Sequence, residues 1–418
     1  MNYFTYKGGE LYAEEVPVGT LVKRYGTPLY IYSYKTVLRH FRAYDEAYSS
    51  YPHIVCFAMK ANSNGAILRI LAREGCGADV VSGGELFRAL RAGIPAGRIV
   101  YAGVGKTDRE IEFALKSKIL MFNVESAEEL REIDRVARSM KVKAPVALRI
   151  NPDIDPRTHP YISTGMREHK FGIALEDALE HYRIAARLQN ISVVGVQKHI
   201  GSQITKIAPF VEAMKKILLL ADELNRRRFS IRYVDIGGGL GIPYHDEEPP
   251  EPRDLARALL PLVDGRKITL IMEPGRSIAG NAGILVTKTL YLKKGADKKF
   301  VIIDAGMNDL MRPSLYGAYH HIQPVLKSRR SEMTADIVGP ICESGDFMAR
   351  GRRMEKVKPG EYLAIMSAGA YGMSMGSNYN SRPTVAEVLV RGRTHRLIRK
   401  RGSYEDLVRD EIVPAYLK

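Results

Sequence analysis

Cysteine is scarce in this 418-residue chain, which contains only Cys56, Cys76 and Cys342. So few cysteines in so long a chain exclude a disulfide framework and predict a reducing, cytoplasmic compartment. The chain also lacks any apolar run near the ~18 residues that a membrane-spanning helix needs. Its first residues show no charged start followed by an apolar run. We therefore expect neither a secretory signal nor a membrane partner.

Acidic residues are outnumbered: 63 Lys and Arg face 47 Asp and Glu, which gives a net charge of +16. A basic chain can bind nucleic acid, but here the excess is spread along the sequence. The densest basic cluster, residues 391–402, contains no aromatic side chain that could stack on a base. We therefore expect a solvated basic surface and no nucleic-acid partner. The composition, 45% hydrophobic and 26% charged, is that of an ordinary globular protein.

Eight short apolar segments are typical of buried parallel strands. They span residues 54–59, 78–81, 99–102, 119–123, 145–151, 193–199, 231–236 and 268–273. Segments with helical periodicity lie between them. Three of these begin at Ser82, Thr107 and Ser126 with the S/T-x-x-E spacing of a capping box. Eight strands alternating with helices predict a (β/α)8 TIM-like barrel over residues 34–280.

The pattern changes after residue 280. Short strand-like runs separated by glycine, proline and charged turns predict an all-β domain over residues 281–418. Residues 29–32 are also strand-like, and we expect the N-terminal segment 1–33 to pack with that domain. The expected fold class is therefore α/β plus all-β, with a barrel and a C-terminal β-domain joined by the N-terminal segment.

Reactive side chains follow several predicted strands, where a barrel of this kind holds its active site. Lys60 ends the first strand among small and apolar residues. Burial disfavours an ammonium there, which suits a lysine that binds a cofactor covalently, although a lysine that only reaches solvent is the alternative. His199 could be a base, a stacking surface or a structural residue. Glu273 and Arg276 could contact a heterocyclic nitrogen and a carboxylate or phosphate, or could pair with each other.

Glycine-rich segments give further candidates. Residues 237–239 could surround a phosphate or form a tight turn. Gly105-Lys106-Thr107 ends like a nucleotide-binding loop, but Val100 replaces the required first glycine, so we do not expect that function. Cys342, beside Glu343 in a glycine-rich turn, is a candidate proton donor, since structural cysteines are usually buried. The sequence contains no cluster of His and Cys residues at the spacing of a metal site, so we expect no metal.

Together these motifs resemble the fold type III family of pyridoxal-phosphate-dependent decarboxylases. The segments that carry the resemblance are FAMKAN (57–62), GADVVSGGEL (77–86), KHIGSQ (198–203), DIGGGLGI (235–242), EPGRSIAG (273–280), DAGMNDLMRPSLYGAYH (304–320), GPICESGDF (339–347) and YNSRP (379–383). The match is closest to the branch that acts on meso-2,6-diaminopimelate.

The resemblance implies a role for each candidate residue. The implied catalytic residues are Lys60, which would bind pyridoxal 5'-phosphate covalently, His199, which would stack on its ring, and Cys342. Glu273 would keep the pyridine nitrogen protonated. Further cofactor contacts are implied at Asp79, Ser202, Gly238, Pro274, Gly275, Arg276 and Tyr371. Substrate contacts are implied at Arg276, Arg312, Tyr316, Glu343 and Tyr371.

The implied reaction converts meso-2,6-diaminopimelate to L-lysine and CO2, the last step of lysine biosynthesis. In the family Cys342 comes from the partner subunit, so the resemblance implies a homodimer with shared active sites. The alternative reactions are those of carboxynorspermidine, ornithine and lysine decarboxylases. The alternative class is a non-catalytic, cofactor-binding regulatory paralogue, which the joint presence of Lys60, Glu273 and Cys342 disfavours.

Overall fold

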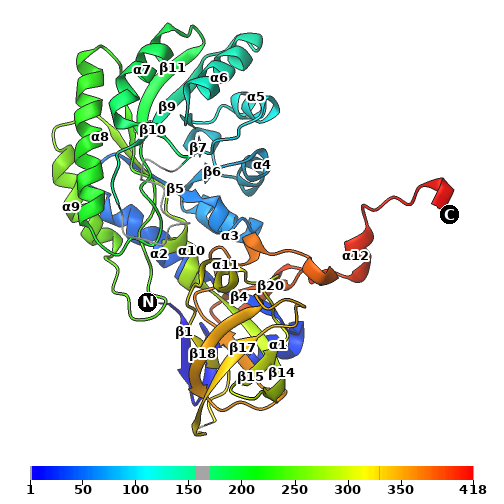
Figure 1. The fold of residues 1–418 in the computed structure, drawn as a ribbon. Helices are drawn as coiled ribbons and strands as arrows, with labels where there is room; N and C mark the ends of the chain where they lie inside the picture. The colour runs from blue at the N-terminus through cyan, green and yellow to red at the C-terminus, as the bar shows by residue number, and fades with distance from the viewer. Residues whose placement is uncertain (1, 156–169, 329, 418) are drawn as a thin grey trace. The chain divides into compact units, whose positions relative to one another are not determined.

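The computed structural model describes residues 2–155, 170–328 and 330–417. The chain forms two compact units (Figure 1). One unit is Val37–Ile278, and the other combines Met1–Thr36 with Ala279–Lys418. Each is described by itself below. Among the described residues, no helix combines the length and the apolar character that crossing a membrane requires.

The first unit is a closed barrel of parallel strands. In chain order the strands are β5 (His53–Ala58), β6 (Gly77–Val80), β7 (Ile99–Tyr101), β8 (Met121–Val124), β9 (Ala144–Asn151), β11 (Ile191–Gln197), β12 (Tyr233–Asp235) and β13 (Thr269–Met272). Each pairs in parallel with the next, and the pairing of β13 with β5 closes the ring. A short strand β10 (Ile173–Ala174) pairs with β9.

All eight predicted strands are present, with boundaries that shift by at most two residues. The predicted barrel is therefore confirmed. The strands could be recognised because both of their faces are buried, which makes them nearly continuous apolar runs. Side chains from six of the eight strands and the loop before β8 fill part of the barrel with one cluster: Ile54, Cys56, Val100, Leu120, Met121, Ala147, Val194 and Ile271.

Helices surround this barrel. They are α2 (Tyr34–Ala47), α3 (Gly65–Arg73), α4 (Gly83–Ala92), α5 (Asp108–Ser117), α6 (Ala127–Ser139), α7 (Ala178–Arg187), α8 (Ala208–Arg226), α9 (Pro252–Val263) and the short α10 (Arg276–Ala279). Figure 1 shows α4 to α8 following one another around the strands.

The three predicted helix caps form, but only one capping box is complete. Ser82, Thr107 and Ser126 each accept a hydrogen bond from the amide three residues on. Only Glu110 returns a bond to its own cap amide. The carboxylates of Glu85 and Glu129 instead accept from the amides of Val81 and Glu125, one residue before the cap. The box predictions at Ser82 and Ser126 are therefore wrong.

The second unit contains two sheets. The small one is β1 (Phe4–Lys7), β2 (Glu10–Ala13) and β3 (Val16–Pro17), followed by α1 (Val18–Tyr25). The large one contains β4 (Leu29–Ser33), β14 (Gly283–Lys294), β15 (Lys299–Ile303), β16 (Ile322–Pro324), β17 (Glu332–Val338), β18 (Phe347–Glu355), β19 (Tyr362–Ile365), β20 (Ala386–Arg391) and β21 (Thr394–Arg399). Two short helices, α11 (Arg312–Tyr316) and α12 (Tyr404–Val408), complete it.

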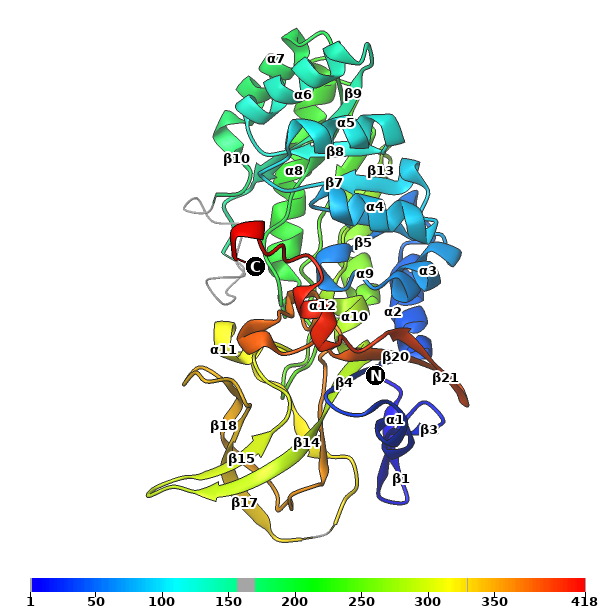
Figure 2. The same ribbon diagram turned by 90° about the vertical axis from the view of Figure 1, so that its right-hand side faces the viewer.

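Strand β4 makes the N-terminal segment part of the large sheet. It pairs antiparallel with β14 and parallel with β20, so it lies between two strands from the other end of the chain (Figure 2). Its Leu29 and Ile31 share a buried cluster with Ile284, Val286 and Val388. The expected joining of the N-terminal segment to the β-domain is confirmed.

Candidate active site

Polar side chains gather at the carboxyl ends of the barrel strands. Asp79, Asn123 and Asp235 lie on β6, β8 and β12, and Glu273 directly follows β13. All four are buried. Because these strands are parallel and closed into a ring, their carboxyl ends meet at one mouth of the barrel.

Lys60 pairs with Asp79. The lysine sits in a 3₁₀ turn, Met59–Ala61, directly after β5. Its Nζ lies 2.9 Å from Asp79 Oδ2, and its side chain is 40% exposed while that of Asp79 is fully buried. The sequence predicted a dry, apolar surrounding for this amine. The structure instead gives it a carboxylate partner, which stabilises the ammonium and fixes where it points.

Glu273 and Asp235 form a buried acidic pair. Asn123 Nδ2 donates to both carboxylates, at 3.2 Å to Glu273 and 3.0 Å to Asp235. Burial raises the pKa of Asp235 to about 6. Burial, reinforced by the charge of Asp235, raises the pKa of Glu273 well above its ordinary value. The two carboxyl groups are hydrogen-bonded to each other, so Glu273 holds a proton that it can give to a basic ring nitrogen.

His199 follows β11 and presents a neutral ring. Its Nδ1 accepts a hydrogen bond from the Gly238 amide at 3.2 Å, which leaves the ring proton on Nε2. Burial lowers the pKa of His199 well below its ordinary value, and the nearby positive charges of Arg149, Lys60 and Lys198 lower it further. A neutral, oriented imidazole is a flat surface on which an aromatic ring can stack.

The glycines after β12 are required by close packing. Gly237 has φ of 65°, and Gly239 has φ of 111°. A Cβ at Gly238 would lie 2.2 Å from the Glu273 carbonyl oxygen, and a Cβ at Gly275 would lie 3.0 Å from Ala58 Cβ. The tight turn is therefore present, and its glycines are required because a side chain at Gly238 or Gly275 would collide with the protein itself.

Arg276 is held in place by two hydroxyl groups. Its Nε and Nη2 donate to Ser202 Oγ at 3.2 and 3.0 Å, and its Nη1 donates to Tyr244 Oη at 2.8 Å. The guanidinium is buried. Glu273, three residues earlier, bonds with Asn123 and Asp235, so the two residues of the EPGR motif have different partners. A guanidinium fixed in this way suits an anionic ligand.

The remaining predicted residues lie in the second unit, where three loops converge. Cys342 and Glu343 are exposed in the turn after β17. The Cys342 amide donates to Asn380 Oδ1 at 2.9 Å, and Glu343 Oε2 accepts from Tyr379 Oη at 2.9 Å. The loop that contains Tyr379 and Asn380 also contacts a third loop, because the Ser377 amide donates to the Asn308 carbonyl at 2.9 Å.

Helix α11 presents Arg312 and Tyr316 near the same turn. Ser314, between them, donates to the Gly345 carbonyl at 2.6 Å. Arg312 is buried, with Nη1 2.8 Å from His320 Nε2. Tyr371 has φ of 55°, a left-handed conformation that is uncommon for a bulky residue and often marks a functional loop. The structure thus places the predicted residues in two groups, one in each unit.

Several residues of the site were missed by sequence reasoning. Asp235 was inside a quoted motif, but only its glycines were considered. Its signal was a carboxylate in an otherwise apolar strand, IRYVDI. Tyr379 was also inside a quoted motif, YNSRP, but was given no role, and Tyr244 lay outside every quoted motif. The roles of both tyrosines depend on loop conformation.

The barrel mouth fits pyridoxal phosphate. Asp79 Oδ1 and Asn123 Oδ1 are buried and have no hydrogen-bond partner among the described residues. An amine, a proton-bearing carboxyl pair, a neutral ring, a glycine turn and a fixed guanidinium match the aldehyde, ring nitrogen, ring face and phosphate of that molecule. This fold and these side chains are those of a barrel protein that binds pyridoxal phosphate.

Comparison with known proteins agrees with a site for pyridoxal phosphate. Residues 34–280 match the family model described as the pyridoxal binding domain of pyridoxal-dependent decarboxylases. The diaminopimelate decarboxylase of Aquifex aeolicus is 51% identical over 97% of this chain and 96% of its own length. That of Vibrio cholerae is 50% identical over 97% and 98%. A crystal structure of the M. jannaschii diaminopimelate decarboxylase in complex with L-lysine has a TM-score of 0.94 at 41% identity, covering 99% of each chain. The chain therefore belongs to the diaminopimelate decarboxylase family.

Proposed function

We propose that this chain decarboxylates meso-2,6-diaminopimelate to L-lysine and CO2, the last step of lysine biosynthesis. The observation that carries the proposal is the barrel mouth, where Lys60 with Asp79, neutral His199 and the proton-sharing Glu273 meet the ends of parallel strands. Family membership over nearly the whole chain supports the substrate.

Pyridoxal phosphate, when bound, supplies an electron sink for the pair of electrons that departing CO2 leaves behind. Lys60 would bind the cofactor through its amine, oriented by Asp79. Glu273 would hold a proton at the pyridine nitrogen, and the charge left on its carboxylate would be shared through Asn123 with Asp235. His199 would support the ring by stacking.

The phosphate end would lie against the glycine turn and the start of α10. Gly238, Pro274, Gly275, Arg276, Ser202 and Tyr371 are the residues we assign to it. Their support is the glycine turn, which carries no side chains, and the fixed guanidinium. An anion placed there is stabilised by charge-assisted hydrogen bonds, which are roughly twice as strong as neutral ones.

Substrate binding is assigned to Arg276, Arg312, Tyr316, Glu343 and Tyr371. Diaminopimelate carries an amine and a carboxylate at its far end. A guanidinium suits the carboxylate through two parallel hydrogen bonds, and Glu343 suits the amine.

We also propose that the working form is a homodimer with shared active sites. Cys342 would give a proton to the carbon that CO2 leaves, completing the reaction with one C–C bond broken and one C–H bond formed. Its support is the exposed position of this thiol on a turn ordered by Asn380, where a second subunit can reach it. We propose a cytoplasmic location as well, since all three cysteines are free thiols.

The test is to incubate the purified chain with pyridoxal phosphate and, separately, meso-diaminopimelate, L-lysine or L-ornithine, and to record CO2 release. We expect rapid release from diaminopimelate alone. Faster release from lysine or ornithine would overturn the substrate, and release from none would overturn the activity.

The lysine assignment is tested without turnover. Borohydride reduction of the cofactor-loaded protein should fix the cofactor to the peptide that contains Lys60. Lys60→Ala should abolish this labelling. If the variant keeps a reducible bond to the cofactor, another lysine carries it.

A further inference from the structure

After its last strand the chain continues as a segment with almost no buried side chain. We call residues 403–417 the C-terminal arm. Every residue of the arm except Leu407 is exposed. Six of the exposed side chains are large and apolar, with exposed fractions from 55% to 89%: Tyr404, Val408, Ile412, Val413, Tyr416 and Leu417. Figures 1 and 2 show this segment in red, extending beyond the strands of its own unit.

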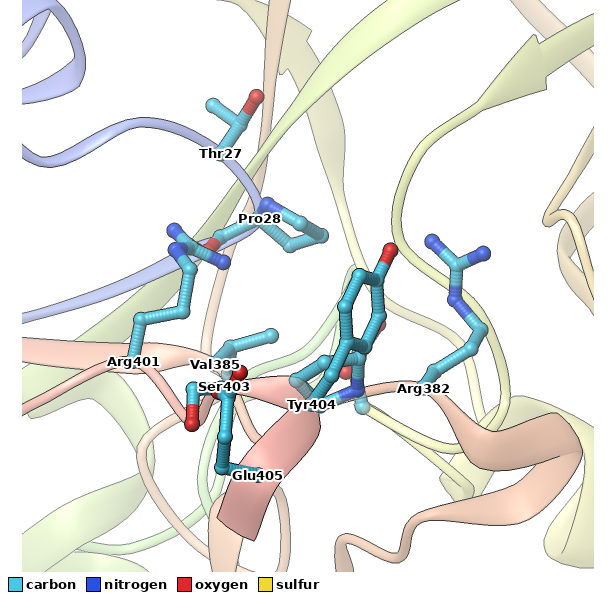
Figure 3. A pocket seen from close by; sticks show the side chains of 11 residues that line it. Thr27, Pro28, Arg382, Val385, Arg401, Ser403, Tyr404 and Glu405 are labelled. Atoms are coloured by element: carbon cyan, nitrogen blue, oxygen red, sulfur yellow. The ribbon is translucent and has the colours of Figure 1, made fainter. Parts of the chain in front are cut away.

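The root of the arm is firmly attached. Arg401 Nη2 donates to the carbonyls of Tyr25 and Pro28 at 3.2 and 2.8 Å, and the Gly402 amide donates to the Thr384 carbonyl at 2.8 Å. Figure 3 shows Arg401 beside Pro28 in the hollow of about 430 Å³ at this root. A complete capping box at Ser403 then starts α12. The arm is thus anchored and begins with ordered structure, yet it presents apolar surface outward, which is the mark of an interaction site.

The arm is acidic in a basic protein. Among residues 403–417, four carboxylates (Glu405, Asp406, Asp410 and Glu411) face one base, Arg409, which gives a charge of −3. The whole chain carries +16. A surface that combines this charge with apolar side chains fits a basic groove that contains an exposed aromatic residue.

The barrel unit has such a groove. It lies between α3 and α4, has a volume of about 560 Å³, and is lined by Gly65, Arg69, Gly84, Phe87, Arg88, Arg91 and Ala92. No carboxylate is among these lining residues. Arg69 and Arg88 are held by carbonyls, since Arg69 donates to Arg91 at 3.2 Å and Arg88 to Ser63 at 3.0 Å. Phe87 is 53% exposed. We call this the α3–α4 groove.

We infer that the C-terminal arm of one copy of the chain docks in the α3–α4 groove of a second copy. The inference rests on the proposed dimer and adds where the two copies hold each other. Three arginines meet an arm of charge −3, and Phe87 meets the apolar side chains near Val413. Because every copy carries both surfaces, a two-fold pair makes the contact twice.

Cross-linking tests the contact directly. In a Cys342→Ser background, whose other cysteines are buried, one tagged subunit carries Val413→Cys and a differently tagged one carries Phe87→Cys. Oxidation, or a short bis-thiol reagent, should join the two tags. The matched control replaces Phe87→Cys with Leu219→Cys, a 70% exposed site on α8. Equal joining at both sites would overturn the inference. So would a cross-link formed only within a single chain that carries Val413→Cys and Phe87→Cys.

Charge reversal tests the energetics. Arg88→Glu with Arg91→Glu should raise the dimer dissociation constant on the order of tenfold, as should Asp410→Lys with Glu411→Lys, and combining all four should restore it. If the dissociation constant of the combined variant rises by the product of the two separate increases, the two surfaces do not contact each other directly. A chain that forms active dimers but fails both tests overturns the arm's docking and leaves the proposed function standing, whereas a fully active monomer overturns the shared site itself.

Discussion

Lys198 is completely buried, and its Nζ has no hydrogen-bond partner among the described residues. The nitrogen lies 5.4 Å from the centroid of the Phe210 ring, on α8. Burial lowers the pKa of Lys198 to about 8, although the nearby carboxyl groups of Asp235 and Glu273 oppose that shift. A buried cation without a hydrogen-bond acceptor costs stability, and its charge beside His199 helps to keep the histidine neutral.

Lys198→Met should therefore stabilise the cofactor-free protein. A fall in the lysine pKa from 10.5 to about 8 corresponds to about 3 kcal/mol, and an apolar replacement of similar size removes that penalty. We expect the free energy of unfolding to rise by about 1–3 kcal/mol at pH 7. Denaturant unfolding measures it, and a loss of stability would mean that Lys198 is a satisfied structural residue.

The stability difference between the parent and Lys198→Met should depend on pH. Between pH 8 and 10.5 the unfolded chain binds a proton at residue 198 that the folded chain does not, so the parent gains stability as pH rises through this range. The methionine variant lacks that gain, and its advantage should shrink from pH 7 to pH 10. Lys215→Met, at an exposed position of α8, is the control and should show a constant difference.

Arg312 provides a test of substrate choice. Its guanidinium is buried against His320, whose Nδ1 lies 2.8 Å from the Met366 carbonyl. If Arg312 binds the distal carboxylate, as we propose, a substrate without that carboxylate loses those hydrogen bonds, and sites built around such contacts can reject a truncated analogue by ~10,000-fold. Lysine is that analogue of diaminopimelate. Arg312→Leu should lower kcat/KM for diaminopimelate much more than for lysine, and equal losses would assign Arg312 to the fold or the cofactor.

At the scale of single elements, strands were easier to predict than the contacts at their ends. The strands were found because burial of both faces leaves an apolar run, whatever the neighbouring strand is. The capping boxes at Ser82 and Ser126 failed because Glu85 and Glu129 have other amides within reach. Glu129 also accepts a hydrogen bond from Lys106, which lies in the loop between β7 and α5. Such choices depend on tertiary structure that the local sequence does not contain.

Lys106 shows how one side chain can connect a loop of the barrel with the neighbouring strand and helix. Its buried ammonium donates to the carbonyls of Gly103 and Asn123 at 2.7 and 2.9 Å and to Glu129 at 2.5 Å. The lysine that resembled the end of a nucleotide-binding loop therefore holds the loop after β7 against β8 and α6.

Thr107 begins α5 with the one complete box among the three predicted ones. Thr107→Ala should reduce the free energy of unfolding by about 1 kcal/mol, because the Glu110 amide in the first turn of the helix loses its acceptor. Thr107→Ser keeps the hydroxyl and should recover most of the loss. Thermal or denaturant unfolding of both variants measures it, and equal stabilities would show that Glu110 alone satisfies this helix end.

For the whole molecule, the decisive question is whether one active site uses two chains. The candidate residues are divided between the units: Lys60, His199 and Glu273 belong to the barrel, while Cys342 and Glu343 belong to the β-domain. Sequence motifs identified both groups, and their resemblance to a known family implies that the partner chain supplies Cys342, but the residues themselves do not show which chain supplies each group. That assignment depends on the assembly, and only an experiment that mixes chains can make it.

Mixing Lys60→Ala with Cys342→Ala provides that experiment. Each homodimer should be nearly inactive, because loss of a positioned proton donor usually lowers the rate ~100- to 10,000-fold and loss of the lysine removes the cofactor bond. After exchange, a heterodimer has one site with both groups and one with neither. Random pairing should therefore restore about a quarter of the parental activity.

The matched control mixes Lys60→Ala with a Lys60→Ala, Cys342→Ala double variant, which can form no complete site and should recover nothing. Tagged subunits measure the exchange. If exchange is complete and the first mixture also recovers nothing, then Cys342 serves the barrel of its own chain. A near-normal rate for Cys342→Ala alone would remove the thiol from the reaction, and the proton would have to come from another group at the barrel mouth.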